Sequence, residues 1–200
     1  MTTLFLVRHG ETDWNRDRRI QGSTDIPLND TGRGQARDAA AALRDELGDA
    51  APVVVSSDLS RARETAEIIA EQLGVPLGTA YPELRERAYG DAEGLGTEEF
   101  HARWGDWHSA EVPNAEPWAG LRTRAIGGMR RVVRDVRRSA TPAASVIVVT
   151  HGALIREVIR HATAGALPPA GERLANGASF RFVVERERLS MHTYAGSALV

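Results

Sequence analysis

The sequence contains no cysteine and no lysine, and all 25 of its basic side chains are therefore arginine. Without cysteine the chain can neither form a disulfide, use a catalytic thiolate nor bind zinc through sulfur. Without lysine it can use neither a Walker-type phosphate loop nor a Schiff base. Any anionic ligand must be held by arginine, histidine, backbone amides or neutral polar groups. The planar guanidinium fork of arginine binds phosphate oxygens in pairs, so phosphate chemistry is still open to this chain.

Long apolar runs are also lacking. No stretch of eighteen apolar residues and no signal-peptide pattern occurs, so we expect no membrane span, no secretion signal and a cytoplasmic location. The net charge of −2 gives no reason to expect nucleic acid or an anionic membrane as a partner. The 200 residues, 42% hydrophobic and 26% charged, suit one domain with a full core, and we expect a single domain over residues 1–200.

Short apolar runs alternate with helical patterns along the chain. The expected strands are Leu4–Val7, Pro52–Ser56, Val75–Tyr81, Ser145–Val149, Ser179–Val184 and Leu189–Tyr194. The expected helices are Asp30–Leu47, a helix capped by Ser57 or Asp58 and running to Leu73, Leu121–Arg138, and Ala153–His161. Residues 10–29 read as a loop, and glycine and proline make residues 89 to about 120 irregular. This order predicts an α/β fold, a three-layer sandwich with a mostly parallel central sheet and helices on both faces.

Polar side chains that could hold an anion follow three of these strands. Arg8 and His9 follow the first strand, Arg61 opens the helix after the second, and His151 follows the strand that ends at Val149. Because the carboxyl ends of parallel strands lie at one edge of a sheet, we expect these four side chains to converge there. The helix N-termini after the later strands add free amides to the same edge. The sequence therefore predicts a phosphate pocket built from three separate segments.

Six blocks of residues resemble the histidine phosphatase superfamily, also called the phosphoglycerate-mutase-like family. They are Arg8–Thr12 with Trp14 and Asn15, Pro27–Gly32, Ser56–Ala62 with Thr65 and Ala66, Glu83–Glu86 with Gly90, Glu93 and Gly94, Val149–Gly152, and Asn176–Ala178. One block alone would be a weak signal. Together, in order and over nearly the whole chain, they are very specific.

The resemblance implies a mechanism. His9 would be the nucleophile that attacks phosphorus, while Arg8, Arg61 and His151 would hold the non-bridging oxygens. Glu86 would protonate the leaving alcohol and then deprotonate the attacking water. The neighbouring arginines should lower the pKa of His9 and keep it unprotonated. Further expected phosphate or substrate contacts are Asn15, Gln21, Gly22, Tyr89 and Gly152. We expect no metal and no cofactor.

Several of these assignments have alternatives within the sequence. Arg63 stands beside Arg61 and could be the pocket arginine instead, and only the resemblance selects Glu86 over the nearby acids. Those acids are Glu83, Asp91 and Glu93. The remaining histidines, His101, His108, His161 and His192, show no metal-ligand spacing. Trp104, Trp107 and Trp118 belong either to the core or to the wall of a substrate entrance.

The resemblance covers both phosphatases and mutases. The cofactor-dependent phosphoglycerate mutases carry a basic middle stretch that grips the substrate carboxylate, whereas this chain has Glu98 and Glu99 where they place a lysine, and only Arg103 before Trp104. We therefore predict a metal-independent phosphomonoester hydrolase of the histidine acid phosphatase type, which acts through a phosphohistidine on a small phosphorylated metabolite. A fructose-2,6-bisphosphatase-like or α-ribazole-phosphatase-like activity falls within that prediction.

The alternatives are a cofactor-dependent phosphoglycerate mutase, and a non-hydrolytic relative that binds phosphate or passes it to a partner protein. One departure from the family bears on the substrate. Glu116 lies in Ala-Glu-Pro, where many relatives have Gly-Glu-Ser, within the segment of residues 89–120 that is expected to cover the site. The expected partner is a small-molecule phosphate ester, and a homodimer remains open.

Overall fold

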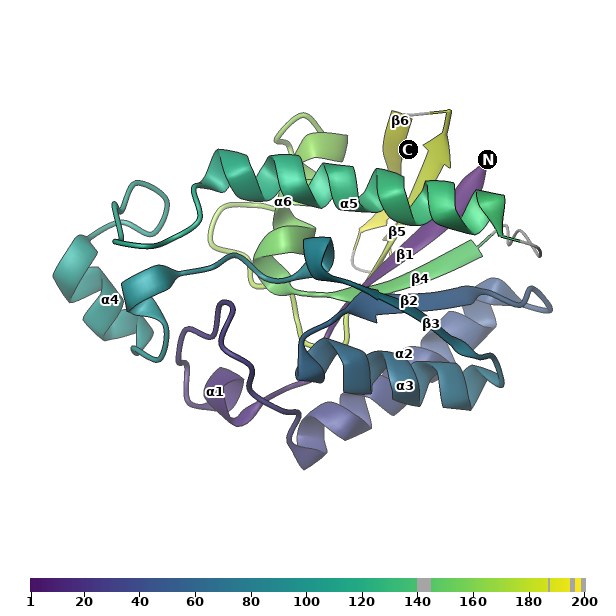
Figure 1. Cartoon of the computed structure of the whole chain (residues 1–200), viewed down its shortest axis with the longest axis horizontal. Helices are drawn as coiled ribbons and strands as arrows, with labels where there is room; N and C mark the ends of the chain where they lie inside the picture. The colour runs from purple at the N-terminus through teal and green to yellow at the C-terminus, as the bar shows by residue number, and fades with distance from the viewer. Residues whose placement is uncertain (140–144, 187, 195–196, 199–200) are drawn as a thin grey trace.

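The computed structural model describes residues 1–139, 145–186, 188–194 and 197–198, and its centre is a seven-stranded sheet (Figure 1). The strand order is β3-β2-β4-β1-β5-β6-β7. The strands are β1 (Thr2–Arg8), β2 (Val53–Ser57), β3 (Leu77–Tyr81), β4 (Ser145–Thr150), β5 (Ser179–Glu185), β6 (Arg188–Tyr194) and β7 (Ser197–Ala198). The helices are α1 (Asp13–Arg16), α2 (Asp30–Leu47), α3 (Ser60–Leu73), α4 (Thr97–Trp104), α5 (Trp118–Arg138) and α6 (Gly152–Ala162), with 3₁₀ turns η1 (Pro82–Leu84) and η2 (Gly90–Ala92).

The sheet is parallel on one side of β1 and antiparallel on the other. Strands β3, β2, β4 and β1 run parallel to one another, whereas β5 pairs antiparallel with β1 and begins an antiparallel β5-β6-β7 unit. The register places Arg8 opposite Thr150 across β1 and β4, and Ser56 opposite Val149 across β2 and β4. The last residues of the three central strands therefore lie side by side.

Helices cover both faces of the sheet, as the sequence predicted. Alternate residues of β1 point to opposite faces, so Phe5 and Val7 pack in the cluster that holds α2 and α3, while Leu4 and Leu6 pack with α5 and α6. Figure 1 shows α2 and α3 on one side of the sheet and α5 and α6 on the other. The α/β three-layer sandwich is confirmed. No helix in the described part of the chain has both the length and the apolar character that crossing a membrane requires.

The segment predicted to be irregular is partly helical, so that prediction was wrong in part. Helix α4 and turn η2 lie within residues 89–120, and α5 begins at Trp118 rather than at Leu121. Phe100 is fully buried in a small separate cluster with Ile20 and Tyr89, against which the side chain of Trp107 packs. A buried aromatic anchor therefore stabilises a helix of eight residues that propensity alone would leave marginal.

The cap predicted for α3 was also wrong. The helix begins at Ser60, and Asp25, from the loop between α1 and α2, accepts hydrogen bonds from the Ser60 backbone N–H (2.8 Å) and hydroxyl (2.7 Å). Asp58 instead binds Arg85 through both carboxylate oxygens, at 2.7 and 2.6 Å. A carboxylate distant in sequence thus supplies the acceptor at this helix N-terminus, which local sequence rules do not detect.

Candidate active site

The four side chains expected to converge do lie together at the carboxyl edge of the parallel strands. Arg8 ends β1, Arg61 lies in the first turn of α3 after β2, and His151 follows β4. The backbone N–H of His9 donates to the Thr150 carbonyl at 2.9 Å, which continues the pairing of β1 and β4 into the site. The ring centroids of His9 and His151 are 5.1 Å apart. These residues adjoin a cleft of about 1090 Å³ whose lining includes Arg8, His9 and Arg61.

His9 is held with a defined ring nitrogen free for chemistry. Its ring is buried, and Nδ1 lies 2.6 Å from the carbonyl oxygen of Gly10. Because a carbonyl can only accept, Nδ1 carries the proton of the neutral ring, and Nε2 keeps its lone pair. Burial, then the charges of Arg61 and Arg8, hold the pKa of His9 well below its usual value. The arginines act in the direction the sequence predicted, although burial has the larger effect.

Of the two arginines of the pocket, Arg61 is buried and Arg8 is half-buried. Arg61 is fully buried and donates from Nη1 to the Thr24 carbonyl and from Nη2 to the Gly22 carbonyl, both at 2.8 Å. Arg8 donates to the Leu174 carbonyl. Burial lowers the pKa of Arg8 to about 10, which leaves it cationic at neutral pH. Arg63, the alternative to Arg61, is turned away from the site and pairs with Glu67.

Four buried nitrogen atoms at this edge have no hydrogen-bond partner among the described residues. They are Nε of Arg8, Nε of Arg61, and both ring nitrogens of His151. Burial, followed by the charges of Arg61 and His9, lowers the pKa of His151 well below its usual value. A buried polar atom without a partner costs about 1–3 kcal/mol, so a bound acceptor would stabilise this arrangement. An anion with several oxygens supplies such acceptors.

Glu86 lines the same cleft at the N-terminus of α6. Its carboxylate accepts hydrogen bonds from the backbone N–H of Ala153 (3.0 Å) and of Leu154 (3.2 Å). A third hydrogen bond comes from the N–H of Arg87 at 2.9 Å. Unpaired N–H groups in the first turn of a helix are a natural partner for a carboxylate. The helix that begins after His151 therefore fixes the position of Glu86.

The other candidate acids make contacts of their own. Glu93 accepts hydrogen bonds from the Ser23 and Thr24 side chains, Asp91 accepts one from the Asn114 side chain, and Glu83 pairs with Arg131. None of these three acids is among the residues that line the cleft, whereas Glu86 is. The structure thus separates Glu86 from its neighbours on geometric grounds, which the sequence could not do.

The remaining predicted contacts all line the cleft. They are Asn15, Gln21, Gly22, Tyr89 and Gly152. Gly152 is close to Arg8, since a Cβ at this position would lie 3.3 Å from Arg8 Nε. Burial, then the charge of Glu86, raises the pKa of Tyr89, so its hydroxyl is neutral at ordinary pH. Asn15 accepts a hydrogen bond from Asn176 at 3.1 Å, which ties the late Asn176–Ala178 block to the site.

One wall of the outer cleft is formed by residues of α6 that the sequence analysis did not single out. Arg156, Glu157 and Arg160 share one face of α6, and Glu157 pairs with Arg122 of α5 at 2.7 Å. Residues of the segment 89–120 contribute Trp107, His108 and Trp118. Eight arginines line the whole cleft against four carboxylates, although the chain as a whole has a net charge of −2. The helical spacing of Arg156 and Arg160 after His151 was the available signal for this wall.

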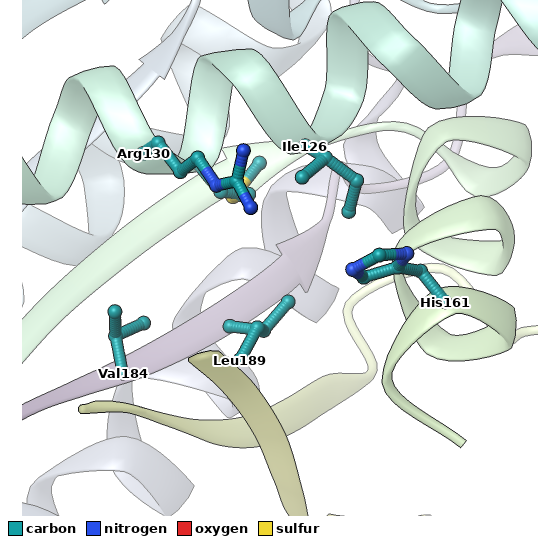
Figure 2. A pocket seen from close by; sticks show the side chains of 6 residues that line it. Ile126, Arg130, His161, Val184 and Leu189 are labelled. Carbon is teal, nitrogen blue, oxygen red and sulfur yellow. The ribbon is translucent and has the colours of Figure 1, made fainter. Parts of the chain in front are cut away.

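A second cavity lies between α5, α6 and strands β5 and β6 (Figure 2). Its volume is about 20 Å³, enough for roughly one water molecule. Figure 2 shows Ile126, Leu189 and the His161 ring around this space. It is too small for a metabolite. In the part of the chain that the structure describes, no group of three or more His, Asp or Glu side chains could hold a metal ion.

Comparisons with known proteins agree with this geometry. Residues 4–195 match the model of the histidine phosphatase superfamily, branch 1. The chain is 39% identical over 191 residues to the uncharacterized phosphatase PhoE of Bacillus subtilis, covering 94% of this chain and 93% of that protein. It is 34% identical over 161 residues to a probable phosphoglycerate mutase, GpmB, of Photorhabdus laumondii, covering 76% and 70%. A vanadate complex of mycobacterial glucosyl-3-phosphoglycerate phosphatase superposes with a TM-score of 0.81 at 26% identity, covering 98% and 100%.

Proposed function

The chain belongs to the histidine phosphatase superfamily, branch 1, and from that membership we propose that it hydrolyses small phosphate monoesters through a phosphohistidine at His9. The observation that carries the proposal is the set of buried nitrogen atoms on Arg8, Arg61 and His151 that lack partners in the described structure, next to a neutral His9. These nitrogen atoms can donate hydrogen bonds to phosphate oxygens, and His9 beside them can act as the nucleophile.

In the first step Nε2 of His9 attacks phosphorus and the bond from phosphorus to the ester oxygen breaks. The hydrogen bond from Nδ1 to the Gly10 carbonyl holds the ring in the reactive tautomer and stabilises the positive charge that develops on it. Arg8, Arg61 and His151 donate to the non-bridging oxygens. Because these donors are fixed before the substrate arrives, they stabilise the transition state without reorganisation.

Glu86 would serve both steps as the proton carrier. It gives its proton to the ester oxygen, so the alcohol leaves neutral, and it then takes a proton from the water that attacks the phosphohistidine. The products are the free alcohol, inorganic phosphate and regenerated His9. Two arginines balance the charge of a phosphate dianion, so the chemistry requires no metal.

We favour hydrolysis over mutase activity because of the middle segment. Arg103, the basic residue that the sequence offers there, pairs with Glu99 at 2.5 Å and lies against the Trp104 ring. It does not line the cleft. We also propose that residues 89–120 cover the site, since several of them, among them Trp107 and Trp118, line its outer part.

The test is a panel of phosphomonoesters assayed with and without a chelator, with His9→Ala and, as a matched control, the exposed His192→Ala. We expect hydrolysis that the chelator leaves unchanged, and an acid-labile phosphoenzyme after rapid quenching. Both should disappear in His9→Ala and persist in the control. Undiminished turnover in His9→Ala would refute the mechanism. Interconversion of 3- and 2-phosphoglycerate faster than phosphate release would replace hydrolysis with mutase activity.

A further inference from the structure

Arg124, on the second turn of α5, links the segment that carries Glu86 to the side chain of Glu116. It donates from Nη1 to the carbonyls of Glu83 (3.0 Å) and Arg85 (2.7 Å), and from Nη2 to that of Glu86 (3.2 Å). Nε and Nη2 also donate to the Glu116 carboxylate, at 2.9 and 2.6 Å. These five hydrogen bonds match the five N–H donors that arginine has.

The segment around Glu86 needs such support because it lacks regular structure. Residues 85–89 belong to neither a helix nor a strand, so their carbonyls have no ladder or helical partner within the segment. Glu116 adds a second link, since its carbonyl accepts from Arg87 Nε at 2.8 Å and its N–H donates to the Ala88 carbonyl at 2.8 Å. The ion pair of Arg124 and Glu116 is itself largely buried, with side chains 25% and 19% exposed.

We propose that Arg124, paired with Glu116, is a positioning residue that holds Glu86 where it can transfer a proton to the leaving alcohol. The inference rests on the proposed function, because it assumes that Glu86 is the acid. Arg124 acts on the backbone at Glu86, while the N–H groups of Ala153 and Leu154 fix the carboxylate itself. Without Arg124 the main chain loses one of these two supports, and the carboxylate loses its alignment with the ester oxygen.

A lysine could take over only part of this role. Lysine has three donors on a single nitrogen at the end of a flexible chain, whereas the contacts of Arg124 reach three carbonyls and both oxygens of one carboxylate. The inference also accounts for Glu116, which lies in the part of the chain where its sequence departs from the family. Its carboxylate accepts two of the five hydrogen bonds that Arg124 donates, and Glu116 is not among the residues that line the cleft.

The test compares substrates whose leaving groups differ in their need for a proton. An alkyl phosphate requires acid catalysis, while the phenolate of 2,4-dinitrophenyl phosphate departs unprotonated. We expect Arg124→Met to lower kcat/KM for an alkyl phosphate by about 10²-fold, as a misplaced catalytic group does, and to change kcat/KM for the dinitrophenyl ester less than about 3-fold. This constant covers only the steps through departure of the alcohol, so it leaves out the later attack of water, in which Glu86 also takes part. Arg124→Lys and Glu116→Gln should show the same selectivity with smaller losses. Arg134→Met, an exposed change on the same helix, is the matched control and should alter neither rate.

The double variant Arg124→Met with Glu86→Gln supplies a second readout. It should be no slower on the alkyl phosphate than Glu86→Gln alone, because a carboxyl group that is absent cannot be misplaced. Equal losses on both substrates would assign Arg124 a general structural role and overturn the inference, as would an unchanged alkyl rate. If Glu86→Gln itself shows no dependence on the leaving group, the acid assignment in the proposed function fails, and the inference fails with it for that separate reason.

Discussion

Replacing Arg61 with methionine tests how the phosphate pocket works. The side chain is fully buried, so methionine fills much of its volume while removing the charge. In the proposed mechanism the guanidinium donates to a phosphate oxygen in the transition state. Loss of one such preorganised donor typically lowers kcat by about 10²–10³-fold, which corresponds to about 3–4 kcal/mol.

The same substitution should change the pH dependence, and its sign follows from the charges. His9 must be unprotonated to attack, so the acid limb of kcat/KM reports the pKa of His9 in the free enzyme. After burial, the Arg61 charge is the largest cause that lowers this pKa. Removing the charge favours the imidazolium and raises the pKa, so the acid limb should move toward neutral pH. Activity in mildly acidic buffer is then lost first.

Stability must be followed in the same experiment. Without Arg61 the carbonyls of Gly22 and Thr24 lose their donors, at a cost of about 1–3 kcal/mol for each one left unsatisfied. Relief from burying a cation offsets part of this cost. Rates should therefore be measured well below the melting temperature of the variant. Arg63→Met, on the exposed side of the same helix, is the control. The ionisation of the substrate affects the pH profiles of both variants equally, so a difference between them comes from the enzyme.

An acid limb that stays in place or moves to lower pH in Arg61→Met would refute the electrostatic reasoning, whatever happens to kcat. A loss of kcat below about 10-fold would show that Arg61 is not a transition-state donor.

Two further predictions concern close packing and substrate charge. Gly10→Ala should lower the melting temperature markedly, because its Cβ would lie 2.3 Å from the Gly32 carbonyl oxygen. Gly34→Ala, at an interior position of α2 where a Cβ would meet open space, should instead raise the free energy of unfolding by about 0.5–1 kcal/mol. Thermal unfolding of both variants tests this difference, and equal shifts in melting temperature would contradict the packing argument. Arg156 lies on the cleft face of α6, about one helical turn after Ala153, whose backbone N–H binds Glu86. Arg156→Gln should therefore raise KM several-fold for a phosphate ester whose alcohol carries a carboxylate, and leave KM for glycerol phosphate unchanged. An equal rise in KM for both esters would mean that Arg156 does not bind the carboxylate.

The fold was predictable because its signals are local and repeated. β-branched apolar runs such as Val53–Ser57 and Ser145–Thr150 suit strands buried on both faces, and amphipathic helices follow them. What local patterns missed were features that depend on distant partners. Asp25 caps α3 from a loop that lies far from it in the sequence, and helix α4 depends on the burial of Phe100.

The sequence by itself determined the residue types of the site and the strand ends at which they stand. A parallel sheet must bring such ends to one edge, so the meeting of Arg8, His9, Arg61 and His151 followed from chain order and strand direction. Only the tertiary structure decided which of several similar groups faces the cleft. It placed Arg61 inward and Arg63 outward, and it set Glu86 at the N-terminus of α6 while its acidic neighbours bind elsewhere. Those choices depend on contacts between segments far apart in the chain, because burial and hydrogen bonding belong to the assembled structure and not to any local stretch of sequence.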